Sequence, residues 1–305
     1  MNSQALMSAD TEESETLLAR QLFASLLADA FRDPRNRLAA ALSPDPDLVS
    51  SAWALLAESF PDLAQGDLSL GELTPERVDP AALAVWLAVD ADTAERIYRT
   101  IFGFVVARDC PPYETEFCHW NDPTFRANQM ADVAGFYRAF GLQPDERCPE
   151  RVDHLSLQVD FVADLLRRLA YLRSQPDPDM STEQQAICVD ALRAFFKDHL
   201  CWWTPTFAGC VERRIDELMR QGVLPCDLSA WRAFRECARI LRAWIAFERI
   251  CARLDPVRQI ISPQVAPLPS HDEEASCGLC DSDDCATSHS QSAPRALDAQ
   301  PGELP

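Results

Sequence analysis

Apolar residues recur at steps of three and four positions through most long segments of this chain, and this spacing constrains the fold more than any other feature. The clearest case is 149–173, where one helical face carries Val152, Leu155, Val159, Val162, Leu166 and Leu169. No alternation of apolar and polar residues is long enough to predict a strand. The pattern therefore predicts an all-α bundle of about nine or ten helices.

Prolines, glycines and capping residues divide the chain into segments. Helices are expected over 13–32, 46–58, 80–89, 92–105, 123–140, 149–173, 181–199, 204–222 and 229–254, with Asp92 capping the fourth. The proline-containing connector 142–149 is the expected hinge between an N-terminal lobe, 13–148, and a C-terminal lobe, 149–261. Disordered ends are expected over 1–12 and 262–305, where polar, acidic and proline residues dominate.

The composition is strongly acidic, with 48 acidic against 28 basic residues and a net charge of −20. Nucleic acid is excluded as a main partner, because phosphate binding needs clustered lysine and arginine. A basic peptide suits such a surface, although acidity also serves solubility alone. The first residues lack a secretory signal, and the longest apolar run, 81–89, is too short to span a membrane. The sequence thus predicts a cytoplasmic protein without stable membrane insertion.

The twelve cysteines are expected to be reduced in that compartment. Those within helical patterns are predicted to be small buried hydrophobic residues: Cys188, Cys201, Cys210, Cys237 and Cys251. The C-terminal Cys277, Cys280, Cys285 and His289 have the spacing of a compact zinc knuckle. No packed or aromatic segment flanks them, so unstructured or redox-active thiols, and no bound metal, are the prediction.

Signatures of common enzymes are missing from the sequence. It contains neither a glycine-rich dinucleotide motif nor a P-loop, and no H-E-x-x-H pair. Asp153 and His154 are adjacent, and neighbouring helical residues point about 100° apart, so they form no relay by themselves. The prediction is a protein without catalytic residues and without a cofactor.

Four segments carry a family resemblance. They are Glu95-x-x-Tyr98-x-x-Ile101-Phe102, the loop 110–117 (CPPYETEF), Glu150-Arg151-Val152-Asp153-His154-Leu155, and His199-Leu200-x-x-Trp203-x-Pro205-x-Phe207. In this order they resemble motifs of the TorD/DmsD family of cytoplasmic chaperones, which mature molybdenum-cofactor oxidoreductases. Two positions depart from the pattern, since Arg151 replaces a proline and Ile101 replaces a leucine.

The resemblance implies a non-catalytic chaperone. Its expected partners are the catalytic subunit of a molybdopterin oxidoreductase and the twin-arginine leader peptide of that subunit. The chaperone would hold this client for molybdenum-cofactor insertion before Tat export, acting as a monomer or a homodimer.

Carried over to this chain, the resemblance assigns client binding first to Asp153 and His154, and then to Tyr113, Glu114 and Trp203. Ordinary structural roles compete with this assignment, because Tyr113 can fill the core and Glu114 can cap the next element. Glu95 and Tyr98 are expected to organise the fold. Asp153→Ala is expected to weaken client binding and to leave melting unchanged.

Two alternatives stay open at this point. One is an assembly factor of the NarJ branch, which binds the mature client and ignores leader peptides. The other is a metal- or redox-responsive protein in which the segment 277–289 is the working part.

Overall fold

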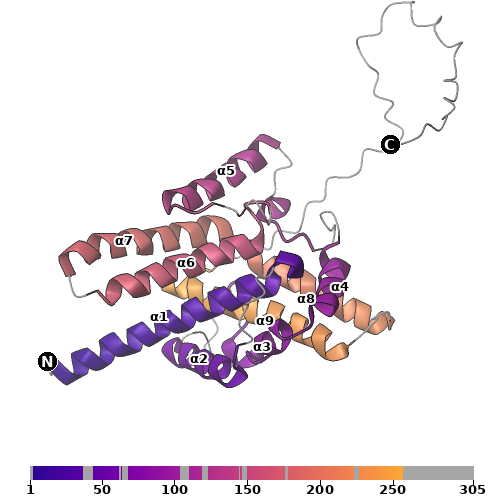
Figure 1. The fold of residues 1–305 in the computed structure, drawn as a ribbon, viewed down its shortest axis with the longest axis horizontal. Helices are drawn as coiled ribbons and strands as arrows, with labels where there is room; N and C mark the ends of the chain where they lie inside the picture. Colours follow the sequence, from indigo (N-terminus) through magenta and orange to yellow (C-terminus); the bar gives the residue numbers. More distant parts are fainter. Residues whose placement is uncertain are drawn as a thin grey trace, which may run out of the picture. The chain divides into compact units, whose positions relative to one another are not determined.

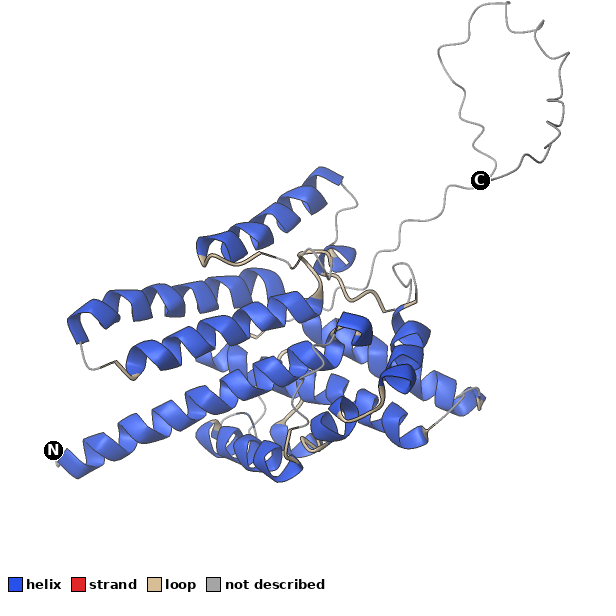
Figure 2. Cartoon of the chain, in the orientation of Figure 1, coloured by secondary structure: helices blue, strands red, loops and turns tan. Residues whose placement is uncertain are grey.

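The fold is built from helices alone in the part of the chain that the structure describes. This computed structural model describes residues 3–36, 44–61, 63, 68–103, 110–118, 123–143, 145, 150–175, 178–222 and 227–256. Nine α-helices and no strand lie within these ranges (Figure 2). The predicted all-α class is confirmed.

The α-helices are α1 (Ser3–Phe31), α2 (Pro46–Ser59), α3 (Ala82–Leu87), α4 (Ala91–Phe102), α5 (Pro123–Ala139), α6 (Leu155–Arg173), α7 (Pro178–Phe195), α8 (Thr204–Gln221) and α9 (Leu228–Cys251). Short 3₁₀ turns are η1 (Pro34–Asn36), η3 (Pro75–Arg77) and η4 (Glu114–Phe117), and a π-helical turn, η5 (Phe196–Leu200), follows α7.

Most helix ends follow local capping chemistry. Asp45 caps α2 by accepting the Asp47 amide, and Gly222 ends α8 in the left-handed region at φ 65°. The expected cap of α4 was wrong by two residues. Asp90, and not Asp92, accepts the Thr93 amide at 3.0 Å, which leaves Asp92 in the first turn, where its charge complements the helix dipole.

Two other helices differ from the expected bounds. α1 begins at Ser3 and so includes most of the segment expected to be a disordered N-terminus. α6 begins at Leu155 and not at residue 149, because His154 is its N-cap and accepts the Ser156 amide on its side chain. Val152 and Asp153 form a turn, and His154 has an extended backbone that pairs with Tyr113 in the loop before η4, which a continuous helix would exclude.

Packing centres on α9. α8 and α3 pack against α9, while α1 lies along α6 (Figure 1). The apolar residues of α9 are buried almost throughout, which confirms the central position expected from its wide apolar surface. The Phe234 ring lies 4.5 Å from Trp86 and 5.6 Å from Phe31, centroid to centroid, so this residue joins α9 to α3 and α1.

Helices from both sides of the expected lobe boundary share one hydrophobic core. α1 precedes residue 148 and α6 follows it, yet the two pack along each other, and α3 likewise packs on α9. The described residues lie within one compact unit, Met1–Val265. The boundaries of the two lobes stay a prediction.

The helical cysteines lie where the sequence suggested. Cys188, Cys201, Cys210 and Cys237 are buried thiols, and Cys251 is a half-buried one. Their small apolar side chains fill the core.

Phe234→Ala is expected to lower the free energy of unfolding by about 3–5 kcal/mol, because it removes a fully buried ring that three helices share. The matched control is Leu48→Ala on α2, where the leucine is 57% exposed; it should change stability by no more than about 0.5 kcal/mol. Urea denaturation followed by circular dichroism measures both. Equal losses for the two variants would contradict the central role of α9.

Candidate functional site

The loop before η4 pairs with the residues that lead into α6. Tyr113 and His154 form an antiparallel bridge. The Glu114 amide donates to the Asp153 carbonyl at 3.1 Å, and the Leu155 amide donates to the Pro112 carbonyl at 2.9 Å. Proline has no amide donor, so Pro112 can join this pairing only as an acceptor. The pairing brings together two motifs that lie about forty residues apart in the sequence.

Asp153 is fully buried in this pairing. Its Oδ2 accepts from the Thr115 amide at 3.1 Å and from the Thr115 hydroxyl at 2.8 Å. The Arg151 guanidinium donates to both carboxylate oxygens, at 3.1 Å from Nε and 2.9 Å from Nη2. Asp153 is therefore satisfied entirely by its own chain, as a buried carboxylate must be.

Arg151 has further partners around its guanidinium. Nη1 donates to Glu116 at 3.1 Å, and Nη2 donates to the Thr115 hydroxyl at 2.6 Å. The guanidinium carbon lies 4.2 Å from the centre of the Tyr113 ring, a cation–π distance. Tyr113 and Glu116 of the loop thus contact an arginine of the same chain, whereas Glu114 of the loop contacts Gln129, Gln158 and His199 and not Arg151.

His154 is fully buried and serves as the N-cap of α6. The Ser156 amide donates to Nδ1 at 3.1 Å, so the proton of the neutral ring lies on Nε2, which is 3.3 Å from the Tyr98 hydroxyl. Burial lowers the pKa of His154 below its ordinary 6.5. This histidine therefore links α4 to the start of α6 in its neutral form.

Glu114 points inward, and none of its surface is exposed. It accepts from Gln129 of α5 at 2.7 Å and from Gln158 of α6, and it lies 3.2 Å from Nδ1 of His199. Burial raises the pKa of Glu114, even though these donors act in the opposite direction. One carboxylate thus joins η4, α5, α6 and η5.

His199 and Trp203 belong to the core beside Glu114. Burial alone would lower the pKa of His199, but the hydrogen bond and the charge of Glu114 outweigh it, so the pKa is raised above 6.5. Trp203 is fully buried, donates to the His199 carbonyl at 2.6 Å and packs 5.2 Å from the Phe117 ring. Both residues organise the fold around the loop 110–117.

A model of the family described as nitrate reductase delta subunit matches residues 77–209. Residues 77–209 are therefore similar to the nitrate reductase delta subunit family, and the match spans less than half of the chain. That family groups NarJ- and NarW-type molybdoenzyme chaperones and is related to TorD/DmsD, so the resemblance drawn from the four motifs is confirmed. The proteins of that family are assembly chaperones for molybdoenzymes. Searches of curated proteins and of solved structures each find no significant match to the chain.

The expected client-binding residues do lie together, but most of them are closed to a client in this conformation. Asp153, His154, Glu114 and Trp203 are fully buried, and Tyr113 is half-buried. Their assignment to client contact stays a prediction. Sequence reasoning missed Thr115, Glu116 and the guanidinium of Arg151; the departure of Arg151 from the family motif was the available signal.

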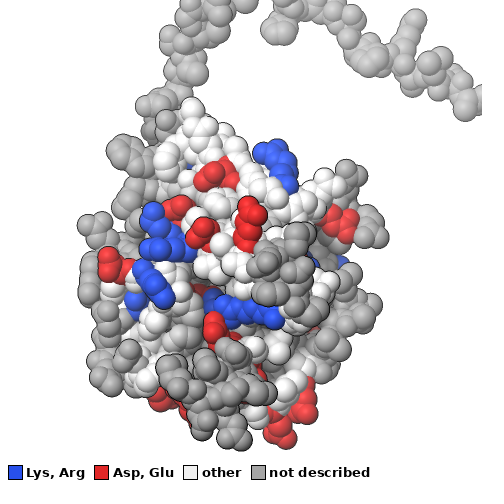
Figure 3. Space-filling view, turned by 90° about the vertical axis from the view of Figure 1, so that its left-hand side faces the viewer, with Lys and Arg blue, Asp and Glu red and all other residues white. Residues whose placement is uncertain are grey.

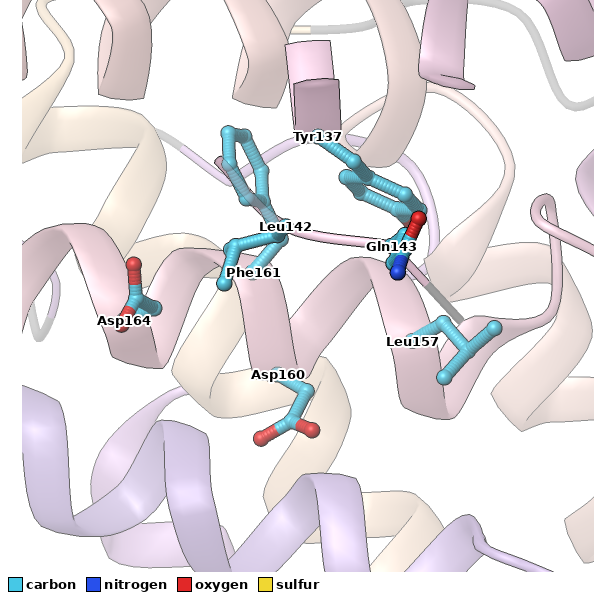
Figure 4. A pocket seen from close by; sticks show the side chains of 7 residues that line it. All are labelled: Tyr137, Leu142, Gln143, Leu157, Asp160, Phe161 and Asp164. Atoms are coloured by element: carbon cyan, nitrogen blue, oxygen red, sulfur yellow. The ribbon is translucent and has the colours of Figure 1, made fainter. Parts of the chain in front are cut away.

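A cavity of about 220 Å³ lies beside the first half of α6 (Figure 4). Leu157, Asp160, Phe161 and Asp164 line one side at helical spacing, while Tyr137, Leu142 and Gln143 line the other. The Tyr137 hydroxyl donates to the Val152 carbonyl at 2.9 Å, so the cavity adjoins the residues that carry Asp153. Its walls combine leucine side chains and aromatic rings with Gln143 and two carboxylates, which pair with arginines: Asp160 with Arg32, and Asp164 with Arg167 and Arg168.

The surface charge is mixed on the end of the bundle shown in Figure 3, where basic and acidic side chains lie side by side. Arg173 and Glu13 form one of the surface ion pairs among the described residues, at 2.9 Å. The large net negative charge is therefore not spread as one continuous acidic area on this face.

No group of three or more metal-ligating side chains occurs among the residues described. Cys277, Cys280, Cys285 and His289 lie outside them, so the metal and redox interpretations of that segment stay predictions. Within the same described ranges, every helix is too short or too polar to cross a bilayer.

Asp153→Ala is expected to lower the free energy of unfolding by about 2–4 kcal/mol, because Thr115 and Arg151 lose their acceptor in a dry site. This replaces the expectation of unchanged melting, since Asp153 has no exposed surface. Asp160→Ala is the control, because its side chain is 52% exposed and its pair with Arg32 should contribute about 1 kcal/mol at most. Urea titration of both variants measures the difference.

The pKa values of the two buried histidines should lie on opposite sides of 6.5, with that of His154 below and that of His199 above. A raised folded-state pKa means that His199 stabilises the fold fully below 6.5 and loses this contribution as pH rises through the raised value. The stability gap between the wild type and His199→Asn, which keeps a donor to Glu114 but does not titrate, should therefore shrink with rising pH. Urea titrations on both sides of the transition measure it, and a gap that grows with pH would contradict the assignment.

Proposed function

We propose that this protein is a cytoplasmic assembly chaperone that binds the catalytic subunit of a molybdopterin oxidoreductase and holds it for cofactor insertion. The observation that carries the proposal is the family match over 77–209. That range contains the η4 loop, the start of α6 and η5, which together form the buried polar centre around Glu114 and Asp153. The candidate site thus lies within the matched segment.

The chemistry of the site suits a client segment that carries arginine next to apolar residues. Tyr113, Glu116 and Asp153 already surround one guanidinium. The neighbouring cavity has room for an apolar side chain, and Asp160 at its edge is half exposed. Arginine recognition and a partly apolar cavity lie side by side along the start of α6, as an extended peptide requires.

A twin-arginine leader would satisfy this chemistry, and so would an arginine-bearing segment of the mature subunit. The family match carries the description nitrate reductase delta subunit, and it fits the second candidate, a NarJ-like factor that binds the mature subunit, as well as it fits the first. The two candidates differ in whether the leader is needed. Deleting the leader from the client abolishes capture in the first case and leaves it intact in the second.

The first experiment is affinity capture of the tagged full-length chain from its native host, with co-purifying proteins identified by mass spectrometry. Recovery of a molybdopterin-type catalytic subunit is the expected result. The capture is then repeated with that subunit expressed without its leader. A capture that yields no such subunit, under conditions where the chaperone is intact, would overturn the proposal.

Gln143→Trp is expected to weaken capture of the recovered subunit about tenfold, because the indole fills the cavity beside α6. Gln143 is exposed, so the substitution leaves the core intact. Gln221→Trp, at the exposed end of α8, adds the same ring away from the cavity and is the control. Titration of the purified subunit compares the two variants, and equal affinities would show that the cavity is not part of the binding surface.

A further inference from the structure

The Arg151 guanidinium sits in a site with four kinds of contact. The Tyr113 ring covers it at 4.2 Å, Asp153 accepts from two of its nitrogens, Glu116 accepts from the third, and the Thr115 hydroxyl accepts at 2.6 Å. A planar fork of donors between two carboxylates and over an aromatic face is the geometry that arginine fits and lysine does not.

The two carboxylates that form this site are more deeply buried than the arginine that occupies it. Asp153 has no exposed surface, and the Glu116 side chain is only 17% exposed. Arg151 keeps 34% of its side chain in solvent, so it enters the site from the outside. Arg151 is also the residue at which this chain departs from the proline of the family motif, whereas Tyr113 and Asp153 keep to the motif positions.

We propose that Arg151 is a built-in ligand of a guanidinium-binding site, and that an arginine side chain of the client competes with it for Tyr113, Glu116 and Asp153. The identity of the competitor rests on the proposed function; the guanidinium site itself does not. Binding of the client then begins with the departure of Arg151 from the site.

The exchange is physically reasonable because it conserves charge. Removing Arg151 alone would leave the carboxylate of Asp153 buried with only the two donors of Thr115. Replacing one guanidinium by another restores the same bonds, while the displaced Arg151 moves into the water that it already touches. Because Arg151 occupies the site, the apparent affinity for a client arginine is the affinity of the vacant site multiplied by the fraction of time that the site is vacant.

The experiment measures the melting temperature of the full-length chain in increasing methylguanidinium. Arg151→Ala vacates the site, and we expect a saturable rise in Tm of several degrees at millimolar concentration. The wild type, whose site Arg151 occupies most of the time, should need about tenfold more methylguanidinium for the same rise. Methylammonium carries the same charge without the fork of donors, and it should leave Arg151→Ala unchanged. A Tm of Arg151→Ala that methylguanidinium does not raise would overturn the proposal.

Two further variants serve as controls for this titration. Arg151→Ala combined with Asp153→Asn lacks the carboxylate and should lose the response to methylguanidinium, so a response that persists counts against the site. If Arg151→Ala is too unstable to purify, Arg151→Gln keeps most of the aliphatic stem without the charge. The same titration on Arg151→Gln then decides the question.

The competition itself is tested with a synthetic peptide of two adjacent arginines followed by an apolar stretch. We expect Arg151→Ala to bind it about tenfold tighter than the wild type, if Arg151 leaves the site vacant for about a tenth of the time. A peptide with lysines in place of the arginines should show no such gain. Equal affinity of both proteins for the arginine peptide would overturn the competition. Failure to capture any client from the host would instead count against the proposed function, because the methylguanidinium titration uses no client.

Discussion

Two carboxylates with no exposed surface, Glu114 and Asp153, hold the centre of this protein in place. A buried carboxylate is strongly destabilising unless several donors reach it. The donors to Glu114 come from α5, α6 and η5, and the donors to Asp153 come from η4 and from the segment before α6. None of these elements can shift without leaving a charge or a donor unpaired, so their positions depend on one another.

This dependence explains where α6 begins. The apolar pattern starts at Val152, but Val152 and Asp153 form a turn closed by the His154 amide and the Arg151 carbonyl at 3.0 Å. Pairing of Asp153 and Leu155 with the loop 112–114 keeps this turn outside the helix. The N-cap bond of His154 then opens the helix, and its ring reaches back to Tyr98 of α4. Two motif segments and a third helix therefore meet at one residue.

The residues that resemble the chaperone motifs hold the fold together and also surround a guanidinium. Glu114, His199 and Trp203 lie inside the core, while Tyr113 and Asp153 form the walls around Arg151. The family match over 77–209 covers both groups. A client-binding role and a structural role for these positions are thus compatible, provided that binding acts on the walls of the Arg151 site and leaves the Glu114 network intact.

The sequence alone determined the all-α class, most of the helix ends and the burial of the helical cysteines, because periodicity, caps and apolar character act within a few residues of the chain. It also led to the family resemblance, through motifs that can be read without any structure. Only the tertiary structure decided that Glu114 points inward and Glu116 towards Arg151, and that Asp153 is paired by its own chain. The partners of these carboxylates lie far away in the sequence; His199, for example, lies 85 positions from Glu114. No local pattern encodes a contact at that separation.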